Sequence, residues 1–113
     1  MEKIHVDGSG DGRYCWFNES KNSYKSYRQK GITNNQAEYF AIIKALEENE
    51  ANEIEIISDS KLVVNQLNRE WHIKNDELRE LFDKIQDIIK EKDKKVIFKW
   101  VYRKENKAGK YLG

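Results

Sequence analysis

The spacing of apolar residues changes along the chain, and this change constrains the fold more than any other feature of the sequence. Residues 3–7 alternate, with Ile4 and Val6 on one face, as in a half-buried strand. Residues 13–18 and 23–28 contain several aromatic side chains and predict two further strands. Because the connections between these segments are short, we expect an antiparallel meander at the start of the chain.

Beyond this meander the spacing becomes helical. Phe40, Ile43 and Leu46 recur at helical intervals within residues 37–49. The next segments are a strand at 53–58, a helix opened by Asp59 and Ser60, a helix capped by Asn75 or Asp76, a strand at 96–101, and room for a short C-terminal helix. The predicted order is βββαβααβ, in one domain spanning residues 1–113. A meander followed by helix–strand alternation predicts an α/β fold with helices flanking a mixed sheet.

Charge is distributed unevenly along the chain, although the formal net charge is only +1. Residues 1–60 carry seven basic and eleven acidic side chains, whereas residues 61–113 carry fourteen and nine. In the last twenty residues Glu105 is the one acid among seven lysines and arginines. This asymmetry indicates either an anionic partner such as a nucleic acid or a solvated, lysine-rich surface.

The sequence carries no signal for export or for a membrane. The one cysteine, Cys15, excludes an internal disulfide, and the adjacent Trp16 and Phe17 predict that it is buried in a strand. No CxxC motif or cysteine–histidine cluster predicts zinc. The first residues lack an apolar signal-peptide core, and no apolar run is long enough to span a bilayer. We therefore expect a soluble, cytoplasmic protein with no membrane partner.

Three acidic residues occupy positions that have both a structural and a functional explanation. Structurally, Asp7 belongs to a glycine-rich turn, Glu38 to a capping box with Asn35 as the N-cap, and Asp59 to the cap of the next helix. Functionally, parallel pairing of the first and fourth strands would bring Asp7 and Asp59 together in the crevice where α/β folds bind ligands. Glu38 would join them from the intervening helix.

Three carboxylates in one crevice repel one another, so this arrangement favours a bound cation. Mg²⁺ and Mn²⁺ prefer carboxylate and water oxygens, and a pair of such ions can activate water and stabilise a leaving oxygen. Residues 33–36 add hydroxyl and amide groups at a helix start, a set that suits phosphate and sugar oxygens. The pattern therefore predicts a divalent-metal site beside a site for phosphate and sugar groups.

Four segments together resemble type 1 ribonuclease H in its compact archaeal and bacterial form. They are VDGSG at 6–10, TNNQAEYFAIIKALE at 33–47, ISDSKLVVNQL at 57–67 and WVYRKEN at 100–106. The resemblance covers nearly the whole chain. It implies a ribonuclease H-like fold whose five-stranded sheet has the order 3-2-1-4-5. It also implies cleavage of the RNA strand of RNA–DNA hybrids with Mg²⁺ or Mn²⁺, leaving 5′-phosphate and 3′-hydroxyl ends.

The resemblance also assigns roles to individual residues. Asp7, Glu38 and Asp59 correspond to the catalytic carboxylates that bind the metal ions, of which we expect two. The positions expected to contact substrate are Gly8, Ser9, Thr33, Asn34, Asn35, Gln36, Arg103, Asn106 and Lys110. The implied partner is an RNA–DNA hybrid, recognised through its backbone and 2′-hydroxyl groups.

The C-terminal segment departs from the family pattern, which usually has a fourth carboxylate in Asn-x-x-Ala-Asp-x-Leu. Alignment on Asn106 or Leu112 puts Lys110 at that position, whereas alignment on Ala108 puts Gly109 there. Neither residue is an acid, and the sequence leaves the choice between them open.

Two further family features are absent. No histidine lies between residues 100 and 106, where the family often has one, and the connector at 68–75 is too short for the basic protrusion of some bacterial members. Trp71, in this connector, either packs in the core or lines a groove for the DNA strand.

These departures leave two functions open. One is an active hybrid nuclease, which the three acids and the TNNQAE segment favour. The other is a hybrid-binding or assembly module with weak or no catalysis on the same fold. The starting Met1 and the complete motif order argue against a fragment of a reverse transcriptase or of another larger protein. No protein partner is indicated, and both a monomer and a dimer remain open.

Overall fold

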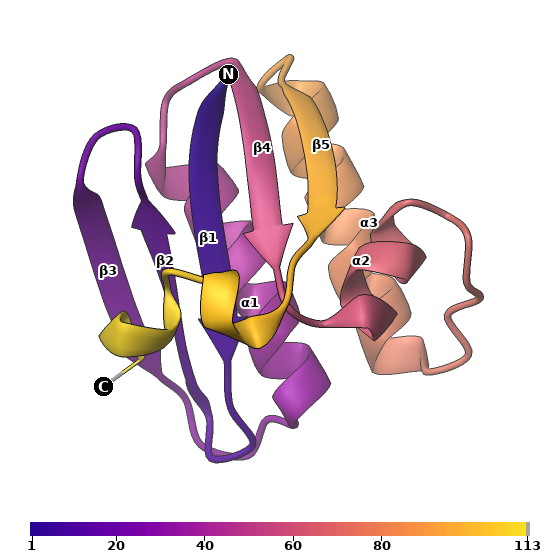
Figure 1. Ribbon diagram of the computed structural model, residues 1–113. Coiled ribbons are helices and arrows are strands. Elements are labelled where there is room, and N and C mark those ends of the chain that lie inside the picture. The colour runs from indigo at the N-terminus through magenta and orange to yellow at the C-terminus, as the bar shows by residue number, and fades with distance from the viewer. Residues whose placement is uncertain (113) are drawn as a thin grey trace.

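The computed structural model describes residues 1–112. Within them the strands and helices follow the predicted order (Figure 1). The limits of three strands are those expected from the sequence, whereas the first strand is longer at both ends and the first helix begins three residues earlier. The elements are β1 (Glu2–Gly8), β2 (Arg13–Asn18), β3 (Ser23–Arg28), α1 (Asn34–Glu48), β4 (Glu53–Ser58), α2 (Lys61–Leu67), α3 (Asp76–Glu91) and β5 (Lys95–Trp100).

The five strands form one mixed sheet in the order β3-β2-β1-β4-β5. β1 pairs antiparallel with β2 and parallel with β4, and β4 pairs parallel with β5. The strand order implied by the family resemblance is therefore confirmed. In the parallel pair, Ile4 lies opposite Ile56 and His5 lies opposite Ile57, so β1 and β4 end at the same edge of the sheet.

The two faces of the sheet are covered by different parts of the chain (Figure 1). α1 and α3 lie behind the sheet and bury Ile4 and Val6 in the main core. The yellow C-terminal segment crosses in front of β1 and β2, where Cys15 and Phe17 are buried with Ala108. Cys15 is thus a buried strand residue, as expected.

The C-terminal segment contains two short 3₁₀ turns, Arg103–Glu105 and Gly109–Tyr111, in place of the expected single short helix. We call residues 103–112 the C-terminal strap. No helix within residues 1–112 is long and apolar enough to cross a bilayer.

Candidate active site

Asp7, Glu38 and Asp59 meet at the edge where β1 and β4 end. Asp7 lies near the end of β1, Asp59 directly follows β4, and Glu38 projects from the second turn of α1. One carboxylate oxygen from each residue lies within 4.8 Å of the other two. The structure therefore brings together the three acids that the sequence singled out, because the parallel pairing of β1 and β4 aligns their carboxyl ends.

Gly8 permits this convergence because it allows α1 to approach β1 closely. A Cβ atom at Gly8 would lie 2.6 Å from the backbone nitrogen of Glu38 and 2.7 Å from the carbonyl carbon of Ala37, which is too close for any side chain. The Gly8 N–H donates to Oδ1 of Asp7 at 2.9 Å and to Oε1 of Glu38 at 3.0 Å. Gly8 thus orients two of the three carboxylates.

The N-cap of α1 is Thr33, and the expected capping box between Asn35 and Glu38 is wrong. Thr33 Oγ1 accepts from the Gln36 N–H at 3.1 Å, and Gln36 Oε1 accepts from the Thr33 N–H at 2.8 Å. The helix begins one residue after Thr33, so its second turn carries Glu38 inward against the sheet. Because Gln36 satisfies the cap, the Glu38 carboxylate is left for the acidic cluster.

Burial and mutual repulsion strongly perturb these acids. Burial, followed by the charges of Asp7 and Asp59, raises the pKa of Glu38 well above its ordinary value. Burial and the charge of Asp59 raise the pKa of Asp7. At neutral pH the three carboxylates can therefore stay this close only if one of them is protonated or a cation is bound. A hard divalent cation fits, because every ligand atom that the cluster offers is a carboxylate oxygen.

Residues expected to contact substrate lie in the turn after β1 and at the start of α1. They differ in whether their side chains are already hydrogen-bonded within the protein. The Ser9 hydroxyl is engaged within its own turn, with Asp11, and the Gln36 amide nitrogen donates to Glu77 at the start of α3. Asn34 is exposed and Asn35 half-buried in the first turn of α1, one turn before Glu38. Ser9 and Gln36 are thus engaged within the protein, and Asn34 and Asn35 lie at the start of the helix that carries Glu38.

The three residues of the strap that were expected to contact substrate differ in their exposure and in their contacts. Arg103 Nε lies 3.7 Å from Oδ2 of Asp59, and the Arg103 side chain is 94% exposed. Asn106 is buried, and its amide nitrogen donates to the carbonyl of Val6 at 2.8 Å, so its side chain is used inside the protein. The Lys110 Nζ lies 5.2 Å from the centroid of the Tyr111 ring.

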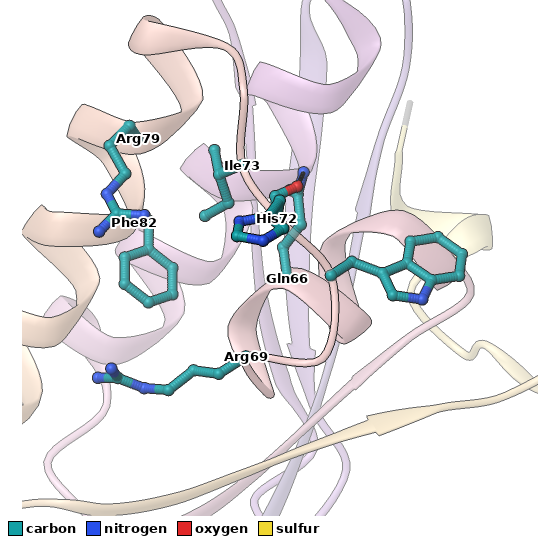
Figure 2. Close-up of a pocket in the computed structure, with 7 residues that line it drawn as sticks. Gln66, Arg69, His72, Ile73, Arg79 and Phe82 are labelled. Atoms are coloured by element: carbon teal, nitrogen blue, oxygen red, sulfur yellow. Dashed lines mark hydrogen bonds between the residues drawn. The ribbon is translucent and has the colours of Figure 1, made fainter.

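A pocket of about 180 Å³ is lined by residues of α2, of α3 and of the connector between them (Figure 2). Trp71 is 48% exposed and lines this pocket, so of its two expected placements the core is wrong. The guanidinium groups of Arg69 and Arg79 lie 5.5 Å and 5.4 Å from the Phe82 ring, on either side of it. This cluster was not predicted from the sequence. Its signal there is the interleaving of basic and aromatic residues around Trp71.

Comparison with known proteins identifies the family. A family model described as reverse transcriptase-like matches residues 11–112. The chain belongs to this family. Solved structures agree, since this reverse transcriptase-like chain superimposes on ribonucleases H1 over almost its whole length.

Two of these structures are similar enough in sequence to compare in detail. LC11-RNase H1 in complex with an RNA/DNA hybrid is 28% identical, with a TM-score of 0.89 over 99% of this chain and 93% of that one. RNase H1 from the halophilic archaeon Halobacterium salinarum NRC-1 is 28% identical, with a TM-score of 0.85 over 98% of this chain and 92% of that one. The fold is therefore that of type 1 ribonuclease H.

Curated relatives match over a shorter region. The bifunctional protein Rv2228c of Mycobacterium tuberculosis H37Rv and an uncharacterized protein of Mycobacterium bovis are each 34% identical over 77 residues. These residues cover 66% of this chain but 21% of each relative, so the chain spans about a fifth of their length. The N-terminal RNase H domain of Rv2228c has a TM-score of 0.80 at 24% identity, covering 100% of this chain and 91% of that one, which supports the fold alone.

Proposed function

We propose that this chain is a ribonuclease H that cleaves the RNA strand of RNA–DNA hybrids and leaves 5′-phosphate and 3′-hydroxyl ends. Asp7, Glu38 and Asp59 would hold two divalent ions, Mg²⁺ or Mn²⁺. The acidic cluster carries the proposal: three carboxylates lie within 4.8 Å at the edge where two parallel strands end. The hybrid in the LC11-RNase H1 structure supports the choice of substrate.

Different residues of the chain would bind the cation and the phosphate. A bound divalent cation supplies Lewis-acid stabilisation of a phosphate oxygen and an acidified water molecule. Glu38 and Asp7 keep fixed orientations through the Gly8 N–H, so their oxygens need little reorganisation to bind a cation. Arg103, exposed beside Asp59, would pair with a phosphate of the hybrid backbone.

A hybrid-binding module with weak catalysis is the second candidate, and one observation favours it. Gly109, which has no side chain, lies beside Asp7: a Cβ atom added at Gly109 would be 3.7 Å from Oδ2 of Asp7. A site with three acids holds a cation less tightly than one with four, because affinity for hard cations rises with ligand charge.

A cleavage assay separates the two candidates. Hybrid with a labelled RNA strand should be cut with Mg²⁺ or Mn²⁺ and left intact with EDTA, while RNA–RNA and DNA–DNA duplexes of the same sequence should be left intact. Affinity should fall as salt rises, because backbone contacts dominate such binding. Tight binding without cleavage in either metal would instead establish the module, and a chain that neither binds nor cuts hybrid would refute both.

The Gly109→Asp substitution should strengthen divalent-metal binding, whereas Lys110→Asp should not. A Cβ atom at 109 would lie 3.7 Å from Oδ2 of Asp7, an ordinary van der Waals distance, so an aspartate there would add its carboxylate next to that acid. The matched change at 110 would replace a side chain whose Nζ lies over the Tyr111 ring. We expect about a tenfold lower Mn²⁺ dissociation constant for Gly109→Asp by titration calorimetry. A larger gain for Lys110→Asp would contradict this placement of the strap.

A further inference from the structure

The C-terminal strap crosses in front of the sheet (Figure 1) and contacts β1, β2 and β3, the last through Ser26 and Tyr24 against Tyr111. The Lys107 N–H donates to Nδ1 of His5 at 3.1 Å, and the Asn106 amide donates to the Val6 carbonyl at 2.8 Å. The Cys15 thiol donates to the carbonyl of Ala108 at 3.2 Å. The contacts of residues 106–108 lie between the two strap residues that reach the acidic site, Arg103 and Gly109.

His5 is the side chain that connects the strap to the strand carrying Asp7. It is 3% exposed, and it lies two residues before Asp7, on the same face of β1. Because Nδ1 accepts from Lys107, the proton of the neutral ring lies on Nε2, which donates to Glu19 at 2.6 Å. Glu19 in turn pairs with Lys107 Nζ at 3.4 Å, so imidazole, carboxylate and strap form a closed ring of contacts.

We propose that His5 is a positioning residue for the acidic site, holding the strap so that Arg103 stays at Asp59 and Gly109 stays at Asp7. The proposal rests on the proposed function of that site. His5 does not reach the acids itself. It acts through the Lys107 backbone, which lies four residues from Arg103 and two from Gly109.

The strap has a built-in reporter, since Cys15 is the one cysteine of the chain and lies beneath it. Burial, with the charges of Asp7 and Glu38, raises the pKa of Cys15 to about 12, so the docked state should react slowly with a thiol reagent such as DTNB. We expect lifting the strap to expose the thiol with the sheet intact, because Ala108 of the strap packs on Cys15 while β1 and β2 pair with each other. The labelling rate under native conditions therefore measures strap opening.

Three substitutions of His5 separate its two hydrogen bonds. Asn places its side-chain oxygen near the Nδ1 position and retains the acceptor for Lys107, whereas Gln retains a polar group near Nε2 and Phe retains neither. We expect His5→Gln and His5→Phe to raise the Cys15 labelling rate about tenfold, the usual effect of one lost hydrogen bond. His5→Asn should stay within about threefold of the wild type. His72→Gln, a change of the other histidine in the α2–α3 connector, should leave labelling unchanged.

Cleavage kinetics then test positioning rather than stability. With the strap displaced, Arg103 is misplaced, so His5→Gln and His5→Phe should raise KM for hybrid about tenfold with kcat within about twofold, and His5→Asn should restore KM. Far-UV circular dichroism confirms that each variant is folded, and Phe keeps the ring packing if Gln does not fold. Unchanged labelling, or faster labelling with unchanged KM, would overturn the proposal.

Failure of the proposed function can be recognised separately. If the wild type binds hybrid without cutting it, the dissociation constant of a fluorescent hybrid takes the place of KM, and the same order of variants is expected. If it does neither, the proposed function fails and the positioning role fails with it. Labelling would still show whether His5 holds the strap.

Discussion

Asp7→Asn should reduce hybrid cleavage by about a thousandfold or more, because removing one carboxylate charge from a metal site costs several kcal/mol of transition-state stabilisation. The substitution preserves the shape of the side chain, and its oxygen can still accept from the Gly8 N–H, which lies 2.9 Å from Oδ1. Glu38→Gln and Asp59→Asn should abolish cleavage for the same reason. Single-turnover cleavage with saturating enzyme and Mg²⁺ is the measurement.

The matched control for this series is Asp87→Asn, an exposed acid on α3 that lies outside the acidic cluster. It removes the same charge from the chain and should leave cleavage within about twofold of the wild type. If any one of the three cluster variants kept a tenth of wild-type activity, its carboxylate would not be a metal ligand in the reaction.

Glu38→Gln should make the metal-free protein more stable at neutral pH, although it abolishes cleavage. Burial and the charges of Asp7 and Asp59 raise the pKa of Glu38, so the folded state holds a proton that the unfolded chain releases above the ordinary value of 4.5. The stability of the wild type should therefore fall as pH rises from about 4 toward neutrality. Gln carries no charge to be buried, so much of this loss should disappear.

Thermal unfolding in EDTA between pH 4 and pH 8 measures this effect. The unfolding midpoint of Glu38→Gln should exceed that of the wild type at pH 7 by several degrees, since each 1 kcal/mol of stability shifts the midpoint by about 4 °C. The two midpoints should converge near pH 4. Mg²⁺ should raise the wild-type midpoint at pH 7 and leave that of Glu38→Gln almost unchanged. The exposed Glu80→Gln control should follow the wild-type profile, and a lower midpoint for Glu38→Gln at pH 7 would contradict the expectation.

Local sequence patterns predicted most of the secondary structure. The limits of β2, β3 and β4 were correct because each is a short run of alternating or aromatic residues between turn residues. The N-cap of α1 was misplaced because Thr33, Asn34 and Asn35 are all good caps and adjacent in sequence. For Trp71 the sequence left the core and a surface groove open, and the α2–α3 connector places it on the surface.

The sequence by itself determined the order of the elements and the three acids that meet, because strand period, helix period and the carboxyl ends of parallel strands are local or topological properties. Only the tertiary structure decided between Gly109 and Lys110 as the residue beside Asp7. A shift of one residue in the strap exchanges them, and no local pattern sets that register. It is set by contacts between residues about a hundred positions apart in the chain, from Asn106 to Val6 and from Lys107 to His5.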